Sequence, residues 1–126
     1  MIRFSDLDIF DSDNTDDFAV PKYVEKRGFI YIMQNKYYPD IFKIGRTTDL
    51  PKRLLAYNEN QPSVTTKVIA VSNMLENCHY VESRILAWFK KEVEPIQYKK
   101  EWFDIKYMDK AIEFIEDAEK RFTIKE

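Results

Sequence analysis

Two short runs, Gly28–Ile32 and Phe42–Thr47, constrain the fold of this chain more than any other feature, because they predict a pair of β-strands. Side chains alternate between the two faces of a strand, so one face of this pair would be apolar. That face would be formed by Ile30, Ile32, Phe42 and Ile44. Tyr31 and Lys43 would lie together on the opposite face, where their polar groups are available for chemistry.

The segment between the two runs, residues 34–40, predicts a turn. It contains the turn-forming residues Asn35, Pro39 and Asp40, so the two strands are expected to fold back on each other as a β-hairpin. A half-buried hairpin has one apolar and one polar face whether or not it has a function. The hairpin alone therefore leaves a functional and a purely structural interpretation open.

A helix is predicted over residues 49–57, with Thr48 as its cap and Pro51 in its first turn. Its apolar face would hold Leu50, Leu54 and Tyr57. Arg53 lies on the flank of that face, near the rim of the hairpin. The planar guanidinium suits a pair of phosphate oxygens, so Arg53 beside Tyr31 and Lys43 predicts a phosphodiester site. The alternative for Arg53 is a solvated helix charge.

A second helix is predicted over residues 75–91. Its packing stripe would be formed by Cys78, Val81, Ile85 and Trp88. Glu82 borders this stripe, and His79 lies one turn before it, so the two side chains could face the same way and hold a metal ion. The alternative for His79 is an ordinary surface or hydrogen-bonded histidine.

The rest of the chain predicts scaffold. Residues 64–71 are rich in β-branched side chains and predict a third strand. Residues 101–105 predict a short strand or an extended segment, in which Trp102 and Phe103 fill the core. A last helix is expected over residues 108–122. Its apolar stripe would be Ala111, Ile112, Ile115, Ala118 and Phe122. The predicted fold class is α+β, with a small antiparallel sheet of about three strands flanked by helices.

Length and composition predict one small domain without covalent staples. The chain has 126 residues, of which 44% are hydrophobic, and a single cysteine, Cys78, which excludes a disulfide framework and a cysteine-rich zinc site. The start of the chain lacks a basic and apolar leader, and no apolar stretch approaches the roughly 18 residues that span a bilayer. We therefore predict a cytoplasmic protein that does not bind membranes, in the host cytoplasm if the gene is viral.

Charge divides the chain into three parts. Residues 1–20 form an acidic segment with six aspartates and one arginine, residues 21–107 form a domain with a net charge of +5, and residues 108–126 carry −2 and hold the last helix. The basic central part is the one that suits nucleic acid.

The acidic N-terminal segment contains Asp11 and Asp13, which resemble the start of a calcium loop. The mid-loop glycine is absent and the twelfth position is Lys22, so an EF-hand is excluded. Two interpretations remain for this segment. It could cover the basic surface and compete with DNA, or it could dock elsewhere through its apolar residues for stability.

Several motifs occur in an order that resembles the GIY-YIG nuclease superfamily. These are Gly28-Phe29-Ile30-Tyr31, then Lys43-Ile44-Gly45-Arg46-Thr47, a helical Arg53, a helical Val81-Glu82, and Glu101-Trp102-Phe103. The chain is most similar to the compact phage and bacterial subfamily that has Lys-Ile-Gly in the second motif and ends in Glu-Trp-Phe. The resemblance covers about residues 27–105.

The resemblance implies a site residue by residue. Tyr31, Lys43, Arg53 and Glu82 would be catalytic. Beside them, the charge of Arg46 and Arg53 makes both candidates for binding phosphate. Glu82 would hold Mg²⁺ or Mn²⁺, and His79 and Tyr57 are accessory candidates. Either Tyr31 or Lys43 could take the proton from water, but Lys43 would need a pKa lowered to roughly 7 or 8 for that role.

Two functions from different classes follow. The first is a metal-dependent endonuclease or nickase that hydrolyses DNA; members of the family it resembles are often encoded by a virus or a mobile element. The second is a catalytically weakened nucleic-acid-binding or protein-binding module, such as an inhibitor. Tyr31, Lys43, Arg53 and Glu82 together favour the enzyme, whereas Leu86 stands where the subfamily often has a histidine and favours the module. A homodimer or a protein partner is open in either case.

Overall fold

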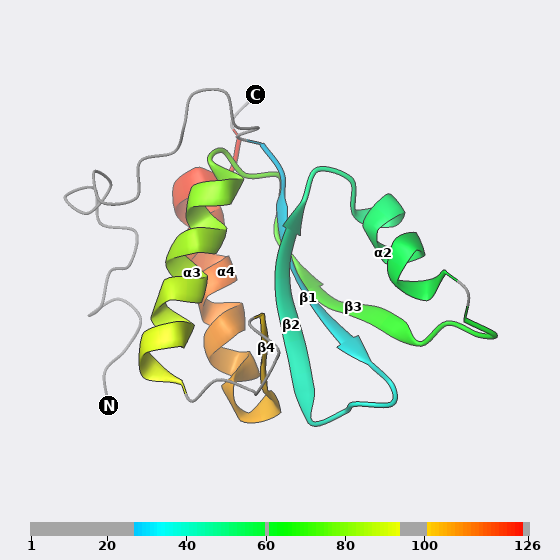
Figure 1. Cartoon of the computed structure of the whole chain (residues 1–126). Helices are drawn as coiled ribbons and strands as arrows, with labels where there is room; N and C mark the ends of the chain where they lie inside the picture. The colour runs from blue at the N-terminus through cyan, green and yellow to red at the C-terminus, as the bar shows by residue number, and fades with distance from the viewer. Residues whose placement is uncertain (1–26, 60, 94–100, 125–126) are drawn as a thin grey trace.

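The computed structural model describes residues 27–59, 61–93 and 101–124, so the acidic N-terminal segment and both hypotheses about it lie outside the described residues. Figure 1 shows the elements in chain order. They are β1 (Phe29–Asn35), β2 (Ile41–Thr47), α2 (Leu50–Asn58), β3 (Thr66–Val71), α3 (Cys78–Glu92), β4 (Trp102–Asp104), the 3₁₀ turn η2 (Ile105–Tyr107) and α4 (Met108–Phe122). Within these described ranges, no helix is both long and apolar enough to cross a membrane.

The sheet is antiparallel throughout, with strand order β3-β1-β2-β4. The predicted α+β class is therefore confirmed, but the expected number of about three strands is one too few. The extra strand, β4, is only three residues long and pairs Phe103 with Phe42 of β2. The sequence left a short strand and an extended segment open for residues 101–105, and the pairing with β2 makes this segment a strand.

The hairpin has the predicted register. Tyr31 lies opposite Gly45 and Met33 lies opposite Lys43, so Tyr31 and Lys43 share one face of the sheet as expected. Arg46 lies opposite Ile30 and therefore belongs to the other, apolar face. Because Arg46 lies on the opposite face from Lys43, the two cations find different carboxylate partners on the two sides of β2.

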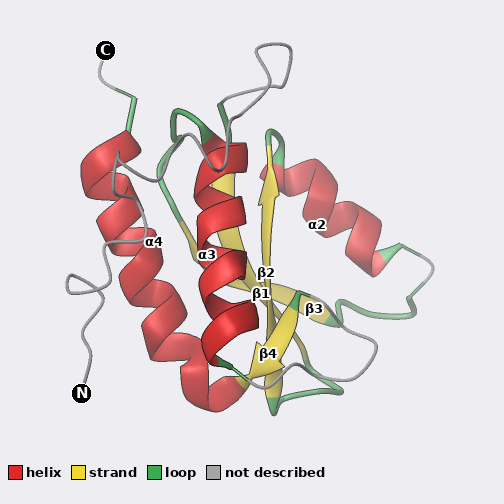
Figure 2. Cartoon of the chain, turned by 60° about the vertical axis from the view of Figure 1, so that its left-hand side comes forward, coloured by secondary structure: helices red, strands yellow, loops and turns green. Residues whose placement is uncertain are grey.

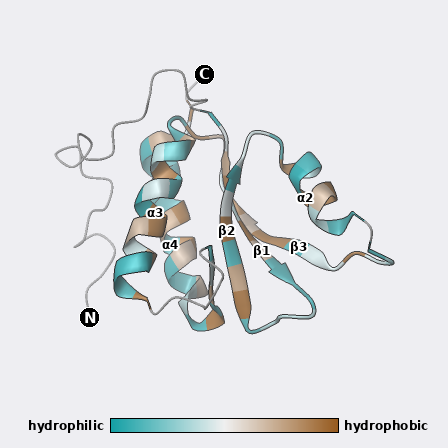
Figure 3. Ribbon diagram, in the orientation of Figure 1, coloured by the Kyte–Doolittle hydropathy of each residue, from teal (hydrophilic) through white to brown (hydrophobic). Residues whose placement is uncertain are grey.

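Helices cover the two faces of the sheet unequally. α3 and α4 lie side by side on the apolar face, and α2 lies on the other (Figures 1 and 2). Hydrophilic and hydrophobic colours alternate along α3 and α4 in Figure 3, as expected of helices with one buried side. α2 has no buried residue, so the core belongs to the α3 and α4 side.

Phe89 is at the centre of this core. It is fully buried, and its ring contacts those of Phe42, Phe103 and Phe114 at centroid distances of 6.3, 4.5 and 6.1 Å. The sequence predicted Trp88, rather than Phe89, as the last residue of the buried stripe of α3, but Trp88 is only half-buried. Cys78, Val81 and Ile85 are buried as expected, and positions 88 and 89 both continue their spacing, so the sequence pattern could not choose between them.

Three further boundary predictions needed correction. α2 is capped by Asp49 rather than Thr48, because the Asp49 side chain accepts a hydrogen bond from the Lys52 amide at 3.1 Å. α3 begins at Cys78, because Leu75 forms isolated β-bridges with Gly28 and Thr123. The third strand begins at Thr66 rather than at residue 64.

α4 runs from Met108 to Phe122, as predicted. Its buried residues are Ala111, Phe114, Ile115 and Ala118. Phe114 was not expected among them, whereas Ile112 and Phe122, which were, are half-buried at the edge of the core.

We expect Phe89→Ala to lower the free energy of unfolding by about 3–5 kcal/mol, because it leaves a cavity where several rings meet. Urea denaturation followed by circular dichroism measures the change. Leu55→Ala is the matched control, since Leu55 is 71% exposed and should have almost no effect. Equal effects of the two substitutions would contradict this description of the core.

Candidate active site

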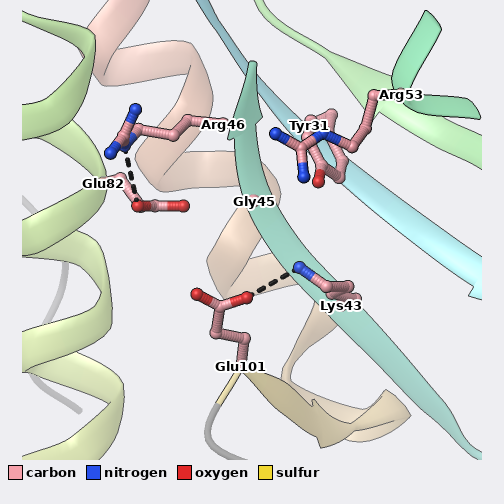
Figure 4. A pocket seen from close by; sticks show the side chains of 7 residues that line it. All are labelled: Tyr31, Lys43, Gly45, Arg46, Arg53, Glu82 and Glu101. Carbon is pink, nitrogen blue, oxygen red and sulfur yellow. Dashed lines mark hydrogen bonds and ion pairs between the residues drawn. The ribbon is translucent and has the colours of Figure 1, made fainter. Parts of the chain in front are cut away.

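One pocket gathers the predicted catalytic residues. It has a volume of about 190 Å³ and is shown in Figure 4. Its lining residues are Tyr31, Lys43, Gly45, Arg46, Arg53, Glu82 and Glu101. They come from β1, β2, α2, α3 and the position just before β4, so the pocket unites residues that are far apart in sequence.

The pocket lies around the edge of β2. β4 pairs with β2 from Ile41 to Lys43, and among the described residues no strand pairs with that edge beyond Lys43. Tyr31 and Arg53 approach from the α2 side, whereas Arg46 and Glu82 meet on the α3 side (Figure 4). Side chains from both faces of the sheet can therefore reach one small volume.

Gly45 makes this arrangement possible. A Cβ atom at position 45 would collide with the Cζ and hydroxyl oxygen of Tyr31. The glycine is required here because the tyrosine ring lies directly against the strand backbone, rather than for an unusual backbone conformation. Tyr31 is thereby held at the edge of β2, with only 1% of its surface exposed.

Two ion pairs organise the charges. Arg46 Nε lies 3.2 Å from Glu82 Oε1, and Lys43 Nζ lies 2.7 Å from Glu101 Oε2. No carboxylate of the described residues pairs with the guanidinium of Arg53. Arg53 is therefore the pocket cation best able to receive an incoming anion.

Tyr57 of α2 lies next to the pocket. The Nζ atom of Lys43 is 5.7 Å from the ring centroids of both Tyr31 and Tyr57, within the range of cation–π attraction. Burial alone would lower the pKa of Lys43, but hydrogen bonding with Glu101 and Tyr57 outweighs it and leaves that pKa raised. Burial and the neighbouring Tyr57 also raise the pKa of Tyr31. At neutral pH the pocket therefore holds a lysine ammonium and a neutral phenol.

Glu82 is the carboxylate with the least solvent in this pocket, at 13% side-chain exposure. Burial raises its pKa, and Arg46 opposes that shift. Figure 4 shows one carboxylate oxygen directed at Arg46 and the other directed toward Gly45. The second oxygen is available to a cation that enters the pocket.

The pocket offers few side-chain ligands for a metal ion. Within the part of the chain that the structure describes, no three His, Cys, Asp or Glu side chains form a metal-binding group, and His79 does not line the pocket. Mg²⁺ is often held by one or two carboxylates together with waters and substrate phosphates. Glu82 therefore suits Mg²⁺ only if substrate oxygens complete the coordination.

A profile of the T5orf172 domain matches residues 28–119, which include every residue of the pocket. The chain belongs to the T5orf172 domain family. This domain occurs in phage and bacterial nuclease-like proteins, and membership is compatible with DNA binding. Neither curated proteins nor solved structures gave a significant match.

The sequence identified most of the lining of this T5orf172 pocket. Tyr31, Lys43, Arg53 and Glu82 are brought together with Arg46. Glu101 was missed as a site residue, although its place at the start of the Glu-Trp-Phe motif was a usable signal. It was assigned to scaffold because nothing in the sequence showed that β4 would pair beside Lys43.

We expect Gly45→Ala to destabilise this T5orf172 domain by about 1–3 kcal/mol, because the new methyl group must displace the Tyr31 ring. The same substitution should cost much less in a Tyr31→Ala background, where the ring is absent. A double-mutant cycle of unfolding free energies measures this coupling. Strictly additive effects would show that the ring does not lie against Gly45.

Proposed function

We propose that this T5orf172 domain is a metal-dependent endonuclease or nickase of the GIY-YIG type, which hydrolyses phosphodiester bonds in DNA. The observation that carries the proposal is the shared pocket of Tyr31, Lys43, Arg53 and Glu82. An acid, a phenol and two cations around one small volume match the needs of phosphodiester hydrolysis. The reaction needs charge neutralisation, an oriented water and a way to remove its proton.

Arg53 is the proposed ligand of the phosphoryl oxygens. Its guanidinium lies beside the Tyr31 hydroxyl in Figure 4, and no described carboxylate competes for it. Negative charge grows on the phosphoryl oxygens during attack, and a fixed cation within the pocket stabilises that charge. Lys43 and Arg46 add two further positive charges to the lining.

Glu82 is the proposed metal ligand, through the carboxylate oxygen that faces Gly45. A Mg²⁺ or Mn²⁺ ion bound there would supply a Lewis acid for the substrate oxygens. Glu82 itself remains bound to Arg46 through its other oxygen, which fixes the direction of the carboxylate. The ion pair thus orients the ligand before a substrate arrives.

Tyr31 is the better candidate for accepting the proton of the attacking water. A protonated lysine has no lone pair, and Lys43 is held as an ammonium by Glu101. The hydroxyl of Tyr31 can orient a water as it stands, and it can accept the proton once ionised. Burial and Tyr57 raise the pKa of Tyr31, and the positive charge of Arg53 offsets this shift only in part, so Tyr31 meets the water first as a neutral hydroxyl.

A second function, a nucleic-acid-binding or protein-binding module, is favoured by one observation. Leu86 lies one turn after Glu82 and lines an apolar groove with Val93 and Phe103, so α3 offers no polar group at that position. If the missing histidine is essential, the pocket would bind phosphate without hydrolysing it. The assay below separates the two functions.

We expect the purified chain to nick supercoiled plasmid in Mg²⁺ or Mn²⁺ and to lose this activity in excess chelator. Glu82→Gln and Arg53→Ala should each slow nicking by about 10²-fold or more, because each removes a charge that acts on the phosphoryl group. The measurement is the rate of conversion to open-circular DNA.

The matched control is Glu92→Gln, the same substitution on an exposed residue at the end of α3, which should nick at the wild-type rate. Undiminished nicking by Glu82→Gln or in chelator would refute the metal site. Tight DNA binding without cleavage of duplex, branched or single-stranded DNA would instead establish the binding module.

A further inference from the structure

We propose that Glu101 is a positioning residue of this pocket, which holds the Lys43 ammonium in place as a fixed ligand for a substrate phosphate. The inference rests on the proposed function, because it assigns Lys43 a task on the phosphodiester. It concerns the ion pair between Lys43 and Glu101, which closes the pocket on the β4 side (Figure 4).

The burial of Lys43 makes a partner necessary. Its side chain is only 11% exposed, whereas that of Glu101 is 42% exposed. An ammonium that loses most of its water is costly unless an opposite charge or several acceptors replace that water. The 2.7 Å contact from Lys43 Nζ to Glu101 Oε2 supplies the opposite charge and one acceptor. Lys43 can therefore remain charged in a nearly enclosed position.

Glu101 is itself fixed relative to β2. Its backbone carbonyl accepts a hydrogen bond from the Ile44 amide at 3.1 Å, and the next residue, Trp102, pairs with Lys43 in the sheet. Phe103 follows and is buried against Phe42. The carboxylate thus projects from a backbone that is hydrogen-bonded to the strand carrying Lys43, so both partners of the ion pair are attached to the same edge of the sheet.

The two ion pairs of the pocket lie on opposite sides of it and hold different cations. Glu82 pairs with Arg46 on the α3 side, and Glu101 pairs with Lys43 on the β4 side. An ammonium has three N–H donors, so Lys43 can bind Glu101 and still direct a donor toward a phosphate oxygen. Glu101 is therefore assigned a positioning role that acts through Lys43, without contact to the reacting atoms.

The test begins with Glu101→Gln, which preserves the shape of the side chain and removes its charge. Single-turnover cleavage should fall by about 10²-fold, because the ammonium is no longer held in position. In a Lys43→Met background, Glu101→Gln should cause no further loss of cleavage rate, since the ammonium through which Glu101 acts is absent. Glu101→Asp, which keeps the charge on a shorter stem, should cleave at an intermediate rate.

A second readout does not depend on cleavage. The side-chain ¹⁵N resonance of Lys43 reports the titration of its amine, and the pKa of Lys43 should fall in Glu101→Gln relative to the wild type. Glu113→Gln is the matched control, because it removes the partner of Lys110, whose Nζ lies 3.1 Å from Glu113 Oε2. It should leave the Lys43 resonance and the cleavage rate unchanged. Thermal melting of each variant establishes that it is folded.

The outcomes separate the inference from the proposed function. An unchanged Lys43 pKa in Glu101→Gln, or additive losses in the double mutant, would overturn the role of Glu101 even if the wild type cleaves DNA. A wild type that cleaves no DNA would overturn the proposed function. Phosphate-dependent movement of the Lys43 resonance, lost in Glu101→Gln, would in that case still support Glu101 as the group that positions Lys43 for phosphate.

Discussion

The pairing of β1 with β2 is the interaction on which the rest of the structure depends. It sets Tyr31 against Gly45 and directs Ile30, Ile32 and Ile44 to the opposite face. A shift of one residue would exchange the two faces, because side chains alternate with a period of two. The apolar face would then lose its contact with α3 and α4, and the pocket would lose its tyrosine. Core and site are thus specified by the same backbone hydrogen bonds.

Much of this arrangement was predictable from local pattern. The alternation in the two hairpin runs gave the shared face of Tyr31 and Lys43, and helical spacing gave α4 and most of the buried face of α3. What local pattern left open or missed depends on distant partners. The residues of β4 were predicted as a short strand or an extended segment, and their pairing with β2 makes them a strand. The start of α3 was predicted too early, because Leu75 forms β-bridges with Gly28 and Thr123 instead of a helical turn.

The charges of the pocket were predictable as residue types but not as pairs. Glu82 and Arg46 reach each other because both lie on the α3 side of the sheet, which follows from the hairpin register and the packing of α3 together. Glu101 meets Lys43 through the pairing of β4. The sequence carries no local sign of either contact. As a result of these two contacts, both carboxylates of the pocket have cationic partners, and Arg53 is the pocket cation that pairs with no described carboxylate.

The edge of β2 that no strand of the described residues pairs with has a further consequence for contacts between molecules. An unpaired strand edge presents backbone donors and acceptors that can recruit a strand from another molecule, and proteins commonly protect such edges with charged side chains. Here Arg46, Glu82 and Glu101 surround the edge where β4 stops, so the charges of the pocket also obstruct edge-to-edge pairing between copies of the chain. Replacing them with apolar residues would remove a candidate catalytic centre and expose an aggregation-prone strand at the same time.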